Sequence, residues 1–288
     1  MTTNPAVASA ERKPRDEEID VFGMTHQGLV RTNNQDHFLF GTLHKTLRVR
    51  TTSLSTPELL ELPGERLGSL FMVADGVGGS EGGEAASRVT IETMAAYGTH
   101  AMQCYYRSDS ADDPSFLAEL QDAARTCHET VLARARERGL PKMATTLTLA
   151  LAVWPRLYLL QVGDSRAYRC RQGELELLTH DQTIAQALVD AGALKPADAM
   201  RSPLRNVLSS AIGGTNEPVV TQHELRHGDV VLLCSDGLTK HVSDDQIQER
   251  FRTMTSSEQA CRALIDDTLK AGATDNVTVL VSRSVLQP

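Results

Sequence analysis

Residues 147–162 read LTLALAVWPRLYLLQV. It holds two apolar runs of strand length, 147–153 and 157–162, with a short turn at Pro155 between them. A second pair of short runs, 167–170 and 175–178, follows directly along the chain. Strands that arrive in adjacent pairs favour antiparallel hairpins over a strict alternation of strands and helices.

Other parts of the chain complete this pattern. Four further strand-length runs are bounded by Gly, Asp or Asn, and they cover residues 38–40, 70–74, 230–234 and 277–281. Apolar residues recur every three or four positions in three other segments, 84–97, 116–135 and 260–269, which predicts helices there. Residues 42–68 are interpreted as a surface excursion between two strands. Residues 1–17 are polar and charged, which predicts a disordered N-terminal tail.

Composition excludes several classes of protein. The 288 residues include 29 basic and 37 acidic side chains, and this net charge of −8 argues against a nucleic-acid partner. The five cysteines form no C-x-x-C pair, which fits a reduced cytoplasm better than a disulfide framework. The first 20 residues lack the apolar stretch of a signal peptide, and the run 147–153 is too short to span a bilayer. We therefore expect a cytoplasmic protein with no membrane partner.

Four aspartates stand at strand ends. Asp75 and Asp236 follow predicted strands, whereas Asp36 and Asp275 come just before them. Each Asp-Gly pair taken alone is explained as an ordinary turn. Four strand-end carboxylates without an obvious basic partner in the sequence repel one another if they converge, and a divalent cation relieves that repulsion. Mg²⁺ and Mn²⁺ prefer such oxygen ligands, so the sequence predicts a site for divalent metal ions.

Seven short motifs resemble those of the metal-dependent PPM/PP2C protein serine/threonine phosphatases, closest to the bacterial branch. In the family's order they are GLVRTNNQD (28–36), VADGVGG (73–79), ATT (144–146), VGDSR (162–166), NVLSSAIG (206–213), CSDGL (234–238) and TDNVT (274–278). The resemblance runs from about residue 19 to residue 283, and seven motifs in order are far more specific than any single one.

The resemblance implies an α+β fold, a four-layer α-β-β-α sandwich of two antiparallel sheets flanked by helices. It assigns residues 18–288 to one phosphatase domain, with a mobile flap at 183–213 beside the site. Gly192, Pro196 and Pro203 in that flap are consistent with irregular structure.

The resemblance also implies the site residues. The position of Asp75 bridges two Mn²⁺ or Mg²⁺ ions, the carbonyl of Gly76 binds one of them, and Asp236 and Asp275 bind the other. Asp36 matches an acidic residue that holds metal-bound water.

Two further positions concern the substrate and a third ion. Arg31 matches the arginine that grips the substrate phosphate, a task suited to a planar and always charged group. Asp164 matches a ligand of a third ion in bacterial members, and a simple turn residue is an equally good interpretation of it. Two departures from the family pattern stand out. Val77 replaces a histidine proposed as a general acid in many eukaryotic members, and Gln35 replaces a glutamate ligand of some members.

The implied reaction is hydrolysis of phosphoserine and phosphothreonine monoesters on proteins by a metal-bridging hydroxide. The expected partners are phosphorylated proteins, the substrates of a cognate kinase, and the chain is expected to be a monomer. Two alternatives stay open at this point: a pseudophosphatase that acts as a binding module, and a phosphatase for small metabolites.

Overall fold

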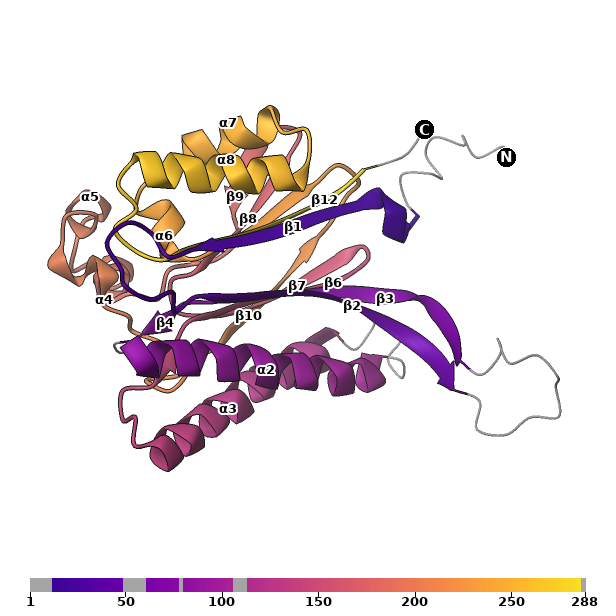
Figure 1. Ribbon diagram of the computed structural model, residues 1–288, viewed down its shortest axis with the longest axis horizontal. Helices are drawn as coiled ribbons and strands as arrows, with labels where there is room; N and C mark the ends of the chain where they lie inside the picture. Colours follow the sequence, from indigo (N-terminus) through magenta and orange to yellow (C-terminus); the bar gives the residue numbers. More distant parts are fainter. Residues whose placement is uncertain (1–11, 49–60, 78–79, 106–112, 286–288) are drawn as a thin grey trace.

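The computed structural model describes residues 12–48, 61–77, 80–105 and 113–285, and it has four layers (Figure 1). Two antiparallel sheets stack face to face, and helices cover the outer face of each sheet. The first sheet has the order β1 (Ile19–His26), β12 (Val277–Ser284), β11 (Val230–Cys234), β8 (Arg166–Arg171) and β9 (Glu174–Leu177). The second has the order β10 (Val219–Glu224), β7 (Arg156–Val162), β6 (Leu147–Val153), β3 (Glu61–Ala74) and β2 (His37–Arg48). The predicted α-β-β-α sandwich is confirmed.

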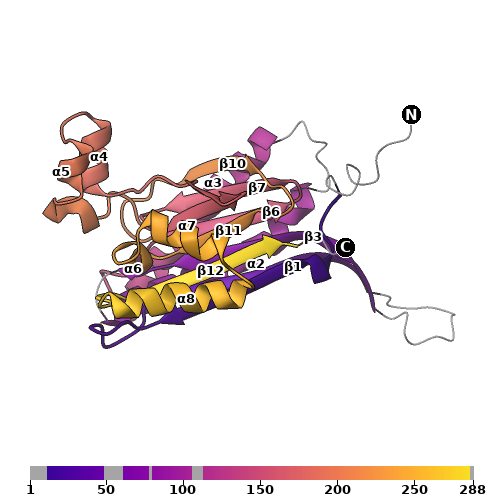
Figure 2. The same ribbon diagram turned by 90° about the horizontal axis from the view of Figure 1, so that it is seen from above.

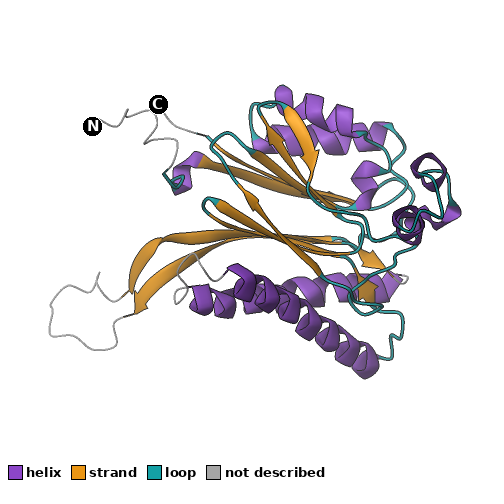
Figure 3. Cartoon of the chain, turned by 180° about the vertical axis from the view of Figure 1, so that it is seen from behind, coloured by secondary structure: helices purple, strands orange, loops and turns teal. Residues whose placement is uncertain are grey.

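Helices complete the two outer layers. Against the second sheet lie α2 (Ser80–Tyr105) and α3 (Asp113–Arg138), and against the first lie α7 (Asp244–Arg252) and α8 (Ser257–Lys270) (Figure 3). The remaining short elements are β4 (Gly76–Val77), β5 (Ala144–Thr145), α6 (Asp236–Thr239) and a 3-10 turn, Asp16–Glu18. The predicted helices at 84–97, 116–135 and 260–269 lie within α2, α3 and α8.

The hairpin β6–β7 shows why these strands form. Its side chains alternate between two apolar environments. Leu149 and Leu160 belong to the core beneath α2 and α3, while Ala150 and Leu159 belong to the core between the sheets. Both faces of the hairpin are therefore buried, which explains why its sequence is apolar almost without interruption. A third apolar core lies between the first sheet and α8.

The interpretation of residues 42–68 as a surface excursion is wrong for most of that range. β2 continues to Arg48 and β3 begins at Glu61, and the two pair along the hairpin with register shifts near His44. β2 is the last strand of its sheet, so polar side chains on it remain in solvent, and polarity alone does not show where it ends. Residues 49–60 lie outside the described residues.

The segment 183–213 also differs from the expectation of irregular structure. It contains α4 (Ile184–Asp190), α5 (Pro196–Ala199) and the 3-10 turn Pro203–Asn206, and these project from one end of the sandwich (Figure 2). Pro196 and Pro203 begin their elements, where a residue without an N–H is tolerated because that N–H would have no helical partner. The prolines therefore mark helix starts.

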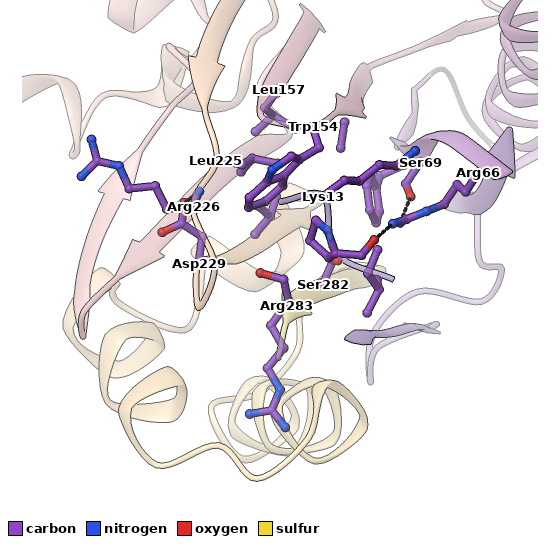
Figure 4. Close-up of a pocket in the computed structure, with 16 residues that line it drawn as sticks. Lys13, Arg66, Ser69, Trp154, Leu157, Leu225, Arg226, Asp229, Ser282 and Arg283 are labelled. Atoms are coloured by element: carbon purple, nitrogen blue, oxygen red, sulfur yellow. Dashed lines mark hydrogen bonds between the residues drawn. The ribbon is translucent and has the colours of Figure 1, made fainter. Parts of the chain in front are cut away.

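The end of the predicted tail packs on the body of the protein. Pro14 is buried, and its carbonyl accepts a hydrogen bond from the Arg66 guanidinium, which also contacts Ser69 and forms an ion pair with Asp16. Pro14, Arg66 and Ser69 border a cavity of about 60 Å³ that is also lined by Trp154 (Figure 4). Disorder as far as residue 17 therefore does not match the structure, and residues 1–11 lie outside the described part of the chain.

Two truncations test this docking. Deleting residues 1–18 should lower the unfolding temperature by a few degrees, because the buried Arg66 guanidinium loses two partners and the cavity opens to solvent. Deleting only residues 1–11 should leave that temperature unchanged. Thermal unfolding followed by circular dichroism measures both, and equal unfolding temperatures for the two truncations would contradict the docking.

Candidate active site

Strand topology gathers the predicted site residues at one end of the sandwich. In an antiparallel pair, the end of one strand lies beside the start of its neighbour. Asp75 follows β3 and Asp36 precedes β2, which is the neighbour of β3. In the other sheet Asp236 follows β11 and Asp275 precedes β12. Asp164 lies in the turn that leads from β7 in one sheet to β8 in the other.

These ends surround a pocket of about 660 Å³. Its lining includes Arg31, Asp75, Gly76, Asp164, Asp236 and Asp275, so the structure brings all but one of the predicted site residues to one cavity. The exception, Asp36, does not line the pocket and is 4% exposed. Segments more than 200 residues apart in the sequence therefore contribute to one site.

Asp36 is fixed by two hydroxyl groups. Ser235 and Thr278 each donate a hydrogen bond of 2.7 Å to its Oδ2 atom. Its Oδ1 atom is buried without a hydrogen-bond partner among the described residues. Burial, and then the nearby charges of Asp236 and Asp275, raise the pKa of Asp36 to about 6 against these hydrogen bonds. Asp36 is thus a buried acid directly behind the pocket.

Asp75 is held through its backbone. Its N–H donates to Thr146 Oγ1 at 3.0 Å, and its carbonyl accepts from the Thr145 hydroxyl at 2.8 Å and from the Thr146 N–H at 2.9 Å. Burial and the charges of neighbouring aspartates raise the pKa of its carboxyl group well above the usual value. The ATT motif therefore positions the residue that precedes Gly76.

The residue after Asp75 must be glycine for steric reasons. A Cβ atom on Gly76 would come within 2.4 Å of the Gly83 backbone in α2 and within 2.8 Å of the Gln35 carbonyl. This close approach of the first turn of α2 to the strand end leaves the Gly76 backbone at the pocket.

Two cationic side chains donate hydrogen bonds to Asp275. Arg31 donates from Nε to Oδ1 at 2.7 Å and from Nη2 to Oδ2 at 2.9 Å, and Lys240 Nζ donates to Oδ2 at 2.8 Å. Burial by itself would raise the pKa of Asp275, but these hydrogen bonds outweigh it, and the pKa lies below its usual value. Lys240 also lies 2.5 Å from Asp236 Oδ2.

Asp164 joins the pocket to a second cavity of about 590 Å³ beside α4 and α5. Its side chain is buried, and burial followed by the charge of Asp236 raises its pKa to about 8. Two residues further along, Arg166 holds Asp181 through two hydrogen bonds of 2.8 and 2.6 Å. The chain just before the segment 183–213 is therefore fixed to the strand that follows Asp164.

The site fits divalent cations that prefer oxygen ligands. Within the described residues, Asp75 and Asp164 take part in no ion pair, and the buried Oδ1 atoms of Asp36 and Asp236 have no hydrogen-bond partner. If all five aspartates are ionised, their negative charges exceed the positive charges of Arg31 and Lys240 by three. No three His, Cys, Asp or Glu side chains of the described chain are arranged to hold an ion unaided. Mg²⁺ and Mn²⁺ suit such a site, because they accept carbonyl and water ligands besides carboxylates.

Two residues of this site were not identified from the sequence. Asn276 donates from Nδ2 to the carbonyls of Gln27 and Asn33, both at 2.8 Å, so it fixes the loop that carries Arg31. Its place in the TDNVT motif was a signal for such a role. Lys240 follows the CSDGL motif by two residues, and nothing in its local sequence indicates its contact with Asp275.

Comparison with known proteins agrees with this geometry. Residues 63–272 match the family described as Protein phosphatase 2C. The chain belongs to this family. The match covers β3 to the end of α8, and it includes Asp75, Asp164 and Asp236.

Two bacterial proteins are among the relatives of this chain. It is 36% identical over 258 residues to the serine/threonine protein phosphatase PstP of Mycobacterium tuberculosis, a match that covers 89% of this chain and 43% of PstP. It is 29% identical over 229 residues to the serine/threonine phosphatase stp of Listeria welshimeri, covering 76% and 86% of the two chains. The chain thus spans less than half the length of PstP.

A solved structure shows the same fold with metal ions. The catalytic domain of PstP in complex with two manganese ions superposes with a TM-score of 0.70 at 32% identity, covering 93% of this chain and 99% of the other.

No helix in the described part of the chain is long and apolar enough to cross a membrane.

Proposed function

We propose that this chain is a metal-dependent phosphatase that hydrolyses phosphoserine and phosphothreonine monoesters on proteins. The observation behind the proposal is one pocket that combines Arg31 with four aspartates, of which Asp236 keeps a buried Oδ1 atom without a hydrogen-bond partner among the described residues. Such a pocket suits a phosphate dianion, because cations held by the carboxylates and the arginine together offset its charge. The relatives in Mycobacterium tuberculosis and Listeria welshimeri are serine/threonine phosphatases by name, which supports this reaction.

Each site residue has its own role in the proposed reaction. Asp75, Asp236 and Asp275 hold two Mn²⁺ or Mg²⁺ ions together with the Gly76 carbonyl, and Asp164 contributes to a third. When bound, such ions lower the pKa of water and neutralise phosphate oxygens. Arg31 binds and orients the phosphate at the mouth of the pocket. Asp36, fixed by Ser235 and Thr278, keeps Oδ1 available to accept a hydrogen bond from water at the site.

The rim of the pocket favours a polypeptide over a small metabolite. Leu29 and Val30 are more than 60% exposed beside Arg31, and Val77 and Val207 are exposed in the lining of the pocket itself. Large apolar side chains gathered around a polar site are typical of a surface that binds another protein. We propose that they contact the residues that flank the phosphorylated side chain.

We also propose the source of the substrates, the compartment and the oligomeric state. The substrates are proteins phosphorylated by a cognate serine/threonine kinase in the cytoplasm, and the chain acts as a monomer. The absence of disulfides among the described cysteines and the acidic composition are compatible with this setting.

Phosphate release from three substrates tests the proposed function. With Mn²⁺ present, we expect hydrolysis of phosphothreonine and phosphoserine peptides at a kcat/KM well above that for glucose 6-phosphate. An Asp75→Asn variant from the same purification controls for contaminating phosphatases. A preference for the sugar phosphate would indicate a metabolite phosphatase. Binding of phosphopeptide without turnover would indicate a pseudophosphatase.

Replacing Arg31 separates substrate binding from chemistry. Arg31→Ala should raise KM for p-nitrophenyl phosphate roughly tenfold with a smaller change in kcat, because the arginine contacts phosphate in the ground and transition states alike. Arg31→Lys should give a KM between those of the wild type and Arg31→Ala, because lysine keeps the positive charge but lacks the planar guanidinium group. Arg134→Ala, at an exposed position on α3, is the matched control. A collapse of kcat with KM unchanged would rule out this role.

A further inference from the structure

Lys240 contacts two of the aspartates that are proposed to hold an ion. Its ammonium group lies 2.5 Å from Asp236 Oδ2 and 2.8 Å from Asp275 Oδ2. The short helix α6 begins at Asp236, so Lys240 comes one turn later on the same face. Its side chain is only 21% exposed. The contact is therefore set by the backbone that also positions Asp236.

The two proposed ion positions differ in whether cationic side chains already contact their carboxylates. Both oxygens of Asp275 are engaged by cations, and Lys240 occupies one oxygen of Asp236. Asp75, in contrast, has no ion pair within the described residues. An ion that binds between Asp236 and Asp275 meets a competing positive charge, while an ion at Asp75 and Gly76 does not.

We propose that Lys240 is a built-in counter-cation that weakens and thereby sets the affinity of the Asp236–Asp275 metal position. The inference rests on the proposed metal-dependent function. A divalent ion and the ammonium group compete for the same Oδ2 atoms, because a carboxylate oxygen that ligates an ion closely cannot keep a cation 2.5–2.8 Å away without strong repulsion.

Two physical consequences follow for the protein. Without an ion, Lys240 offsets the repulsion between two largely buried carboxylates that face each other at the ends of β11 and β12. With an ion, its flexible stem lets the ammonium group move. Lys240 lines the second cavity as well as the first, and that cavity also exposes Asp164, Asp181 and Asp244. The displaced charge therefore stays beside acidic groups.

Calorimetric titration of the chelator-treated protein with Mn²⁺ tests the proposal directly. Lys240→Met keeps much of the apolar stem and removes the charge, so it should tighten one class of Mn²⁺ site roughly tenfold and leave the other unchanged. Lys240→Arg, which keeps the charge, should titrate close to the wild type. Lys270→Met removes an exposed lysine of α8 that lines neither cavity and should have no effect.

The unfolding temperature gives a second readout, because the effect of Lys240→Met on it should depend on whether Mn²⁺ is present. In EDTA, Lys240→Met should unfold at a lower temperature than the wild type, because Asp236 and Asp275 lose their shared counter-charge. With saturating Mn²⁺ it should gain more stability than the wild type gains. A side chain that only packs against the pocket wall would change the unfolding temperature equally with and without Mn²⁺.

The outcomes separate the inference from the proposed function. Unchanged or weaker Mn²⁺ binding in Lys240→Met overturns the inference, as does a raised KM with unchanged Mn²⁺ affinity, which would make Lys240 a phosphate ligand. If the variant binds Mn²⁺ more tightly but the wild type hydrolyses no phosphoester, the inference stands and the proposed function fails.

Discussion

Asp236→Asn is expected to lower kcat for p-nitrophenyl phosphate by about three orders of magnitude while the protein stays folded. Asparagine matches aspartate in size, so α6 and its contact with β12 should survive the change. The charge, however, disappears from a residue whose buried Oδ1 atom has no hydrogen-bond partner in the described part of the chain and whose Oδ2 atom faces Lys240. An amide is a far weaker ligand for Mg²⁺ or Mn²⁺ than a carboxylate.

The measurement needs saturating metal to be decisive. Steady-state kinetics over a range of Mn²⁺ concentrations would show whether extra metal rescues the variant, and circular dichroism would show that it is folded. Asp122→Asn, at an exposed position on α3, removes a carboxylate away from the pocket and should keep wild-type activity. Turnover close to wild type for Asp236→Asn at saturating Mn²⁺ would mean that the site is misplaced.

The parts of the fold that the sequence predicts are those with a strong local pattern. The run that contains β6 and β7 is apolar on both faces because cores lie on both sides of its sheet, and its boundaries were predicted within one residue. The helix α3 shows a clear apolar face in its sequence because that face covers the same sheet. The strand-end aspartates can be found from the sequence because each lies within two residues of such a run.

Other elements depend on partners that are distant in the sequence. β1 contains Gly23, Thr25 and His26, and it is a strand because it pairs along its whole length with β12, more than 240 residues away. β10 is the last strand of its sheet and mixes half-buried with exposed positions, so its sequence carries little apolar signal. Local periodicity does not report such long-range pairing.

The same distinction applies to the site. Which aspartates belong to it could be predicted from their motifs, but which side chains neutralise them could not. Arg31 and Asp275 are 244 residues apart, and Lys240 reaches Asp275 only because α6 and the start of β12 lie together. A Cβ atom on Gly237 would lie 1.8 Å from the Asn276 carbonyl, which shows how closely these segments approach. The charge balance of the pocket is therefore a property of the tertiary structure.

Removing divalent cations is expected to have the largest effect of all. In excess EDTA, hydrolysis of p-nitrophenyl phosphate should fall to background, because no described side chain at the pocket is an activated nucleophile and the carboxylates themselves repel a phosphate dianion. Added Mn²⁺ should restore the activity in full, which distinguishes loss of the ions from irreversible unfolding.

The unfolding temperature should follow the same titration. Ions that bind only the folded state stabilise it by about 2.7 kcal/mol at a concentration one hundred times their Kd. Burial, and then repulsion between neighbouring carboxylates, raises the pKa values of Asp36, Asp75 and Asp164, and bound cations relieve that repulsion. EDTA should therefore lower the unfolding temperature by several degrees, and Mn²⁺ should reverse the change over the concentration range that restores activity. Full activity in EDTA after exhaustive dialysis would exclude metal ions from the reaction, whereas a stability change without an activity change would confine them to a structural role.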